Sequence, residues 1–384
     1  MTASSLNGIY PNYFERAGYL ADDIDRRLAD IFDTIFYGPE DQSFYREDKD
    51  MGYLFDTGNI DVRTEGMSYG MMMCVQFGRK EEFDRIWKWA RTNMYLEGGR
   101  NKGFFCWSNA LDGSKNSNGP APDGEEYFAM ALLFASHRWG DGEGIFDYSH
   151  EACEILHDMI RTGDDERGRG MFDGGNHLIR FITEVDFTDP SYHLPHFYEL
   201  FSKWAYPEDR TFYANAAAAS REFLHRACHS VSGLSSEYSY YDGTPCTEGV
   251  DIWGKHDWYY SDAYRTILNI AMDHVWFGRD KWQEEEGSRF IGFMCDKIGP
   301  GRWDKVLDWD GTVRSEDVLH PVAVIATNAA AAALVPEHDP QYDNALSCIR
   351  RFWDTPLRTG DRRYYDNCLY LFAFMLLSGR YRIW

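Results

Sequence analysis

The chain has 384 residues, 44% of them hydrophobic, which is enough for one large domain or two. Its formal net charge is −23, and because such a surface repels phosphate backbones and anionic lipids, we expect neither nucleic acid nor membrane as a partner. No segment approaches the roughly 20 apolar residues of a membrane span, and the first residues lack the basic and apolar regions of a signal peptide.

Helical patterns recur along the whole chain, whereas strand patterns are almost absent. Because the helices have similar lengths, we predict an all-α fold, an (α/α)6 barrel of six helical hairpins; a helical solenoid is the rival, but no repeat of 30–45 residues is seen. No linker divides the chain, so residues 1–384 are expected to form a single domain. The predicted helices cover 20–36, 66–79, 82–97, 124–139, 148–162, 192–205, 208–229, 258–275, 280–297, 321–334, 339–353 and 364–378.

The segment from Asp56 to Met73 joins a polar loop to a predicted buried helix and carries Glu65 at the junction. Burial would disfavour the charged form of this carboxyl group, which suits a general acid. If Thr64 is the helix N-cap, however, the helix dipole stabilises the anion. Two interpretations remain open at this point: a catalytic acid, or a first-turn residue that complements the dipole.

Two further junctions carry a carboxylate next to small or aromatic residues, Asp123 in residues 119–128 and Asp262 in residues 258–265. Each alone is typical of a helix terminus: Asp123 as an N-cap, Asp262 as a first-turn acid behind Ser261. In a helical barrel, the three junctions would face the same end, which predicts a cluster of carboxylates. Two carboxyl groups that flank a sugar bond are the minimal machinery of glycoside hydrolysis.

Aromatic residues make up 16% of the chain, and many lie in loops beside polar side chains. This combination favours a sugar ligand, which stacks its C–H face on a ring and bonds through its hydroxyls. His193 and His196 are three residues apart, but Pro195 between them opposes a helical metal face. We favour a sugar contact for this pair over a metal site, and a histidine acid/base pair for sugar epimerisation is a weaker alternative.

The eight cysteines are scattered, without a Cys-x-x-Cys pair. Their mostly apolar helical context predicts reduced, buried thiols and a cytoplasmic protein. The sequence implies no metal and no cofactor, and we expect a monomer.

The stretch from Ala121 to Trp139 resembles the signature of glycoside hydrolase family 8, from which it departs at Pro122, Glu125 and Phe128. These departures resemble one branch of the family, exo-acting oligoxylanases that release xylose from the reducing end. Residues 54–70, 189–201 and 361–372 also match that branch, so the resemblance covers essentially the whole chain.

The resemblance implies an inverting reaction on short β-1,4-xylo-oligosaccharides. It makes Glu65 the general acid and Asp262 the general base, while Asp123 holds a distorted sugar and helps to orient the attacking water. A Leu-His-Pro loop closes the cleft in this branch, which makes His320 the residue that meets the reducing-end anomeric hydroxyl. The other residues that resemble sugar-contacting positions are Trp107, Tyr198, Arg265 and Tyr365.

Three alternatives remain. An endo-acting enzyme of the same family would cut cellulose, chitosan or mixed-linkage glucan, and a non-catalytic protein on the same fold would bind oligosaccharides without product. His320 could also be only a helix-entry residue before Pro321 at position N1. Residues 299–317 and 247–256 depart from the branch, which bears on how tightly the cleft is closed.

Overall fold

The computed structural model describes residues 3–163, 166–247 and 256–384, so most of the divergent segment 247–256 lies outside the described residues. The chain divides into two compact units. We call residues 1–32, 187–196 and 220–383 the first unit, and residues 33–186, 197–219 and 384 the second unit. Three helices contain residues of both units: α3 (Ala21–Tyr37), α8 (Pro195–Trp204) and α9 (Arg210–Ala227). The single domain predicted from the sequence remains a prediction.

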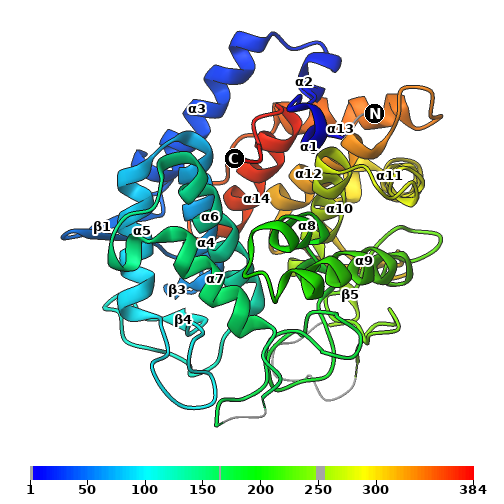
Figure 1. Ribbon diagram of the computed structural model, residues 1–384. Coiled ribbons are helices and arrows are strands. Elements are labelled where there is room, and N and C mark those ends of the chain that lie inside the picture. The colour runs from blue at the N-terminus through cyan, green and yellow to red at the C-terminus, as the bar shows by residue number, and fades with distance from the viewer. Residues whose placement is uncertain (1–2, 164–165, 248–255) are drawn as a thin grey trace. The chain divides into compact units, whose positions relative to one another are not determined.

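The second unit is built around two helices, α4 (Thr64–Phe77) and α6 (Pro122–Trp139), that pack against each other (Figure 1). Both are buried along most of their length because they carry small and apolar residues on every side. Gly70 lets α4 approach strand β2 closely, since a Cβ there would lie 2.3 Å from a methyl carbon of Leu54. The other elements are β1 (Tyr45–Asp48), β2 (Met51–Leu54), β3 (Val62–Arg63), α5 (Lys80–Asn93), β4 (Ser108–Asn109), η1 (Gly144–Phe146) and α7 (Tyr148–Met159).

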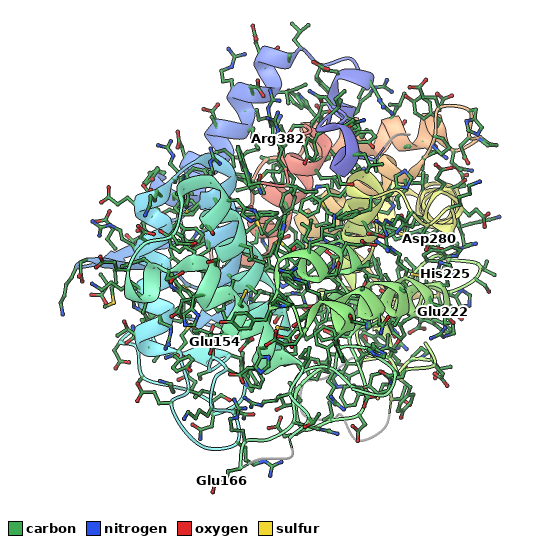
Figure 2. All side chains as sticks on the ribbon, viewed as in Figure 1. Glu154, Glu166, Glu222, His225, Asp280 and Arg382 are labelled. Carbon is green, nitrogen blue, oxygen red and sulfur yellow. The ribbon has the colours of Figure 1, made fainter. Side chains whose placement is uncertain are left out.

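The first unit has a buried pair of helices of its own, α12 (Pro321–Ala330) and α14 (Arg363–Leu377). At its surface, His225 near the end of α9 lies beside Asp280 (Figure 2), with 2.7 Å between Nε2 and Oδ2. The remaining elements are α1 (Ser4–Asn7), α2 (Tyr13–Arg16), η2 (Pro190–Tyr192), β5 (Trp258–Tyr259), η3 (Ser261–Ala263), α10 (Tyr264–Trp276), α11 (Trp282–Gly292), η4 (Phe293–Ile298), η5 (Pro300–Arg302), β6 (Lys305–Asp308), β7 (Val313–Asp317), η6 (Ala331–Leu334) and α13 (Tyr342–Asp354).

Each of the twelve predicted helices has a counterpart, and within the described ranges strands are few and short, so the all-α class is confirmed. The largest error concerns α10, predicted to begin at residue 258 but observed from Tyr264. Trp258 and Tyr259 instead form β5, which pairs antiparallel with β6, and β6 pairs with β7. Trp258, Tyr259 and Tyr260 are aromatic residues that could begin a helix or form a strand, so periodicity alone does not decide between the two.

Two further expectations concern the cysteines and membrane insertion. All eight cysteines, each in the described ranges, are free thiols, and only Cys295 is partly exposed. Its sulfur lies 3.5 Å from that of Cys348. Among the described residues, no helix is long and apolar enough to cross a membrane.

Candidate active site

Glu65 is the second residue of α4 and is partly buried. The N-cap of this helix is Arg63, in extended conformation, and Thr64 is the first helical residue. The Thr64 amide donates to the carbonyl oxygen of Trp107 at 3.0 Å, because β3 and β4 pair directly beside the helix start. Glu65 is therefore placed by a strand pair that leads straight into a helix.

Trp107 is partly exposed and lies against Arg63, whose guanidinium carbon is 5.4 Å from the ring centroid. Arg63 is fixed in turn by Asp61, at 3.0 Å from Nε, and by Asp56, at 3.4 Å from Nη2. The Ser108 hydroxyl donates to Asp61 at 2.7 Å. The contacts among Asp56, Asp61, Ser108 and Arg63 fix the guanidinium that lies against the indole of Trp107. The indole is thereby held beside the segment that carries Glu65, and a ring fixed in this way can stack on a sugar.

Asp123 lies at the start of α6, where Ala121 is the N-cap and Pro122 occupies the first position. Asp123 is thus a buried first-turn residue and not the N-cap, and its carboxylate accepts from the Gly124 amide at 2.9 Å. Gly124 allows α6 to approach α4 closely, because a Cβ there would lie 2.4 Å from Cβ of Thr64. The two first turns that carry Glu65 and Asp123 are therefore in contact.

Asp262, in the first unit, belongs to the short turn η3 that precedes α10. Its side chain is 24% exposed, and Arg265 Nη2 lies 3.0 Å from Oδ1. The Tyr365 hydroxyl lies 3.4 Å from the same oxygen and donates to the Ser261 carbonyl at 3.1 Å. Ser261 has a φ of +43°, which is unusual for a residue other than glycine. Asp262 is accessible and held from two sides.

Two buried acids that the sequence analysis did not single out accompany Asp262. Burial raises the pKa of Asp189 and of Glu237 well above the ordinary values, and the negative charge of Asp262 raises both further. Asp189 Oδ1 accepts from the Ser191 amide at 2.7 Å, while Oδ2 has no hydrogen-bond partner among the described residues. The signal in the sequence was Asp189 before Pro190, the pattern of a helix N-cap, which it is for η2.

His320 is the N-cap of α12, followed by Pro321 at N1, as the helix-entry interpretation requires. Its Nδ1 lies 3.0 Å from Asp366 Oδ2, and its ring centroid lies 4.7 Å from that of Tyr365. Tyr365 therefore contacts both His320 and Asp262. The first unit brings together four predicted site residues: Asp262, Arg265, His320 and Tyr365.

Tyr198 is fully buried in the second unit, and its hydroxyl donates to Glu126, which is fully buried as well. The hydroxyl oxygen can still accept a hydrogen bond while it donates to Glu126, so a sugar contact at Tyr198 stays a prediction. Tyr192 is better placed beside the candidate base, because its ring centroid lies 5.4 Å from the guanidinium carbon of Arg265. The sequence analysis missed Tyr192, although it lies in the matching segment 189–201.

His193 and His196 are also fully buried, and burial lowers the pKa of each to about 3. His193 lies between the hydroxyls of Thr188 and Ser220, each at 2.9 Å. Both histidines are thus neutral core residues, and the expected sugar contact is wrong for this pair. Among the described residues, no cluster of three or more His, Cys, Asp or Glu is arranged to hold a metal ion.

The family model described as glycosyl hydrolases family 8 matches residues 50–379. The chain therefore belongs to this family, and it is a glycoside hydrolase. The family resemblance found in the sequence is confirmed.

Within the family, the chain is similar to named relatives. It is 51% identical to the reducing end xylose-releasing exo-oligoxylanase of Halalkalibacterium halodurans, over 98% of this chain and 94% of that protein. It is 45% identical to the protein of that name from Bifidobacterium adolescentis, over 96% of each. The structure of Rex8A from Paenibacillus barcinonensis complexed with xylose matches with a TM-score of 0.95 at 48% identity, over 100% of this chain and 99% of that one. The predicted fold class is thereby confirmed.

Proposed function

We propose that this protein is an inverting hydrolase that removes one xylose from the reducing end of short β-1,4-xylo-oligosaccharides. The observation that carries the proposal is the similarity, at 45–51% identity over nearly the full chain, to relatives that bear the name of this activity. Two separate observations support it: Glu65 is partly buried at a helix start of the second unit, and Asp262 is accessible in a turn of the first unit.

In the proposed reaction, Glu65 protonates the glycosidic oxygen while Asp262 takes a proton from water. The water oxygen forms a bond to the anomeric carbon as the bond to the leaving xylose breaks, and the configuration inverts. Asp123 holds the sugar at the cleavage point. An inverting pair of carboxyl groups needs roughly 6.5–9.5 Å between them, which leaves room for the water.

We assign substrate contacts to Trp107, Arg265, Tyr365 and His320. The Trp107 ring offers a stacking face, and Arg265 donates to a sugar hydroxyl. His320 meets the anomeric hydroxyl of the reducing-end xylose, a group that only the terminal sugar carries. This contact is what would make the enzyme exo-acting.

The test compares xylotriose with xylotriitol, in which the reducing-end sugar has been opened by reduction. We expect rapid release of xylose from xylotriose, little cleavage of the alditol, and a first product with inverted anomeric configuration by NMR. Equal cleavage of both substrates would refute reducing-end recognition. Loss of viscosity from a soluble glucan would instead identify endo-action, the activity named for relatives that are 25% identical.

We further propose that the enzyme acts as a monomer in the cytoplasm. Its eight free thiols, seven of them buried, suit a reducing compartment. Sedimentation of the purified protein at the mass of one chain, 44.6 kDa, is the expected result. A mass of two chains would contradict the monomer.

A further inference from the structure

Asp366 lies in the first turn of α14, and its side chain is fully buried. Its carboxylate receives three groups from other segments. Oδ1 accepts from the Ala323 amide at 2.8 Å, and Oδ2 lies 3.0 Å from His320 Nδ1 and 2.5 Å from Arg358 Nη1. A buried carboxylate with three hydrogen-bond donors is rigidly held, and it in turn fixes the positions of His320, Ala323 and Arg358.

Arg358 extends this anchor to the backbone of the Leu319–His320 loop. The nitrogen that binds Asp366 also donates to the Leu319 carbonyl at 2.6 Å. The backbone of Arg358 is itself fixed by Asn367, which accepts from its amide and donates to its carbonyl, both at 2.9 Å. The loop is therefore held both through a main-chain carbonyl and through the imidazole.

The start of α12 depends on the same carboxylate. His320 makes no side-chain cap bond, and Pro321 has no amide hydrogen to donate. Ala323, the third residue of α12, donates instead to Asp366, so the negative charge lies at the positive end of the helix dipole. The position of His320 at the entry of α12 is thus set by a residue of α14.

We propose that Asp366 is a positioning residue that sets the orientation and tautomer of His320 for recognition of the reducing-end anomeric hydroxyl. This inference rests on the proposed function. A carboxylate accepts hydrogen bonds, so His320 donates through Nδ1–H, and Nε2 of the neutral ring is left as the acceptor for a sugar hydroxyl. The loop anchor through Arg358 keeps Nε2 in one place. Discrimination at the reducing end then depends on a residue that does not itself touch the sugar.

A second buried aspartate of the first unit offers a matched control. Asp273 is also fully buried and accepts from Arg221 at 2.8 and 2.7 Å and from Gln283 at 2.6 Å. Asp366 and Asp273 are thus both paired with an arginine, but Asp273 binds Arg221 and Gln283, neither of which is assigned to the substrate. Neutralising either removes a buried charge, whereas only Asp366 acts on His320.

The experiment measures kcat/KM for xylotriose and for xylotriitol with the native protein, Asp366→Asn and Asp273→Asn. We expect the ratio of the two values to fall about tenfold in Asp366→Asn, the effect of one lost charged hydrogen bond, and to stay at the native value in Asp273→Asn. Thermal denaturation of both variants measures the loss of stability that each suffers when a buried carboxylate paired with arginine becomes an amide. An unchanged ratio in Asp366→Asn, beside a native enzyme that discriminates, overturns the positioning role.

A double-mutant cycle tests whether Asp366 acts through His320. If it does, adding Asp366→Asn to His320→Asn lowers the ratio no further, whereas independent effects would multiply and contradict the proposal. Should Asp366→Asn fail to fold, Arg358→Gln replaces it, since this side chain is 25% exposed, and the same loss of ratio is expected. If the native protein cleaves xylotriose and xylotriitol equally, the proposed function itself is refuted. This result can be told apart from failure of the positioning role, in which the native protein discriminates and the variant discriminates equally well.

Discussion

The two units hold their candidate catalytic groups in different ways. In the second unit, Glu65 and Asp123 are placed by the backbone, through the strand pair that leads into α4 and the close approach of Gly124 to Thr64. In the first unit, Asp262 and His320 are placed by side chains, namely Arg265, Tyr365 and Asp366.

This difference predicts different responses to mutation. Backbone placement depends on packing, so its loss should affect stability and activity together. Placement by side-chain hydrogen bonds can be removed one group at a time, with activity changing more than stability. The variants Gly124→Ala, in the second unit, and Tyr365→Phe, in the first unit, test this contrast directly.

Glu65→Gln should lower kcat on xylotriose by about 10²- to 10⁴-fold, because the leaving oxygen loses its proton donor. β-Xylobiosyl fluoride releases fluoride with little need for protonation, so the variant should hydrolyse it at close to the native rate. Asp262→Asn is the matched variant, and it should be inactive on both substrates because the base is still required. If both variants hydrolysed β-xylobiosyl fluoride at close to the native rate, the assignment of Glu65 as acid and Asp262 as base would be contradicted.

Gly124→Ala should destabilise the protein by about 1–3 kcal/mol and lower activity at the same time, because the new methyl group would overlap Thr64. Gly98→Ala is the control, since a Cβ there meets nothing within 4 Å. Thermal denaturation and kcat measured on the same preparations check the prediction. A Gly124→Ala variant with native stability and activity would refute placement by packing.

Tyr365→Phe should lower kcat about tenfold while the free energy of unfolding changes by only about 1 kcal/mol. The ring remains in place, but the hydroxyl near Asp262 and the bond to the Ser261 carbonyl are lost. The measurement is kcat together with urea denaturation. If stability fell sharply and kcat did not, the first unit would resemble the second, and the contrast between them would fail.

His193 and His196 predict a pH dependence of stability. Their folded pKa of about 3 lies below the unfolded value of 6.5, so the unfolded state binds more protons between these values. Stability is fully present above pH 6.5 and is lost as the pH falls toward 3, by about 1.4 kcal/mol per pH unit for each histidine. In His193→Gln, urea denaturation from pH 4 to pH 6 should show a slope smaller by that amount. An unchanged slope would mean that His193 is already charged in the folded protein.

The sequence predicted the helices well because their apolar faces recur at the helical period, as in α3 and α13. It failed where local signals were ambiguous: Trp258 and Tyr259 lie in a strand, although aromatic residues just ahead of a helix could also belong to its first turn.

The candidate site residues could be named from the sequence motifs. The residues that hold them in position could not. Asp366 depends on partners 8 to 46 positions away in the chain, and no local pattern links it to His320. Tyr198 and Tyr192 belong to one matching segment, and only burial and contacts distinguish the core residue from the one beside Arg265.

The positive φ of Ser261 has a consequence for how this enzyme could be improved. A serine held in the left-handed region costs on the order of 1 kcal/mol or more, and such a cost persists only where the surroundings enforce it. Glycine at this position would relax the backbone but would also free the turn that presents Asp262. A screen for thermostable variants would therefore select Ser261→Gly, and turnover would decline in that variant. Stability and catalytic activity are thus in conflict at this single residue.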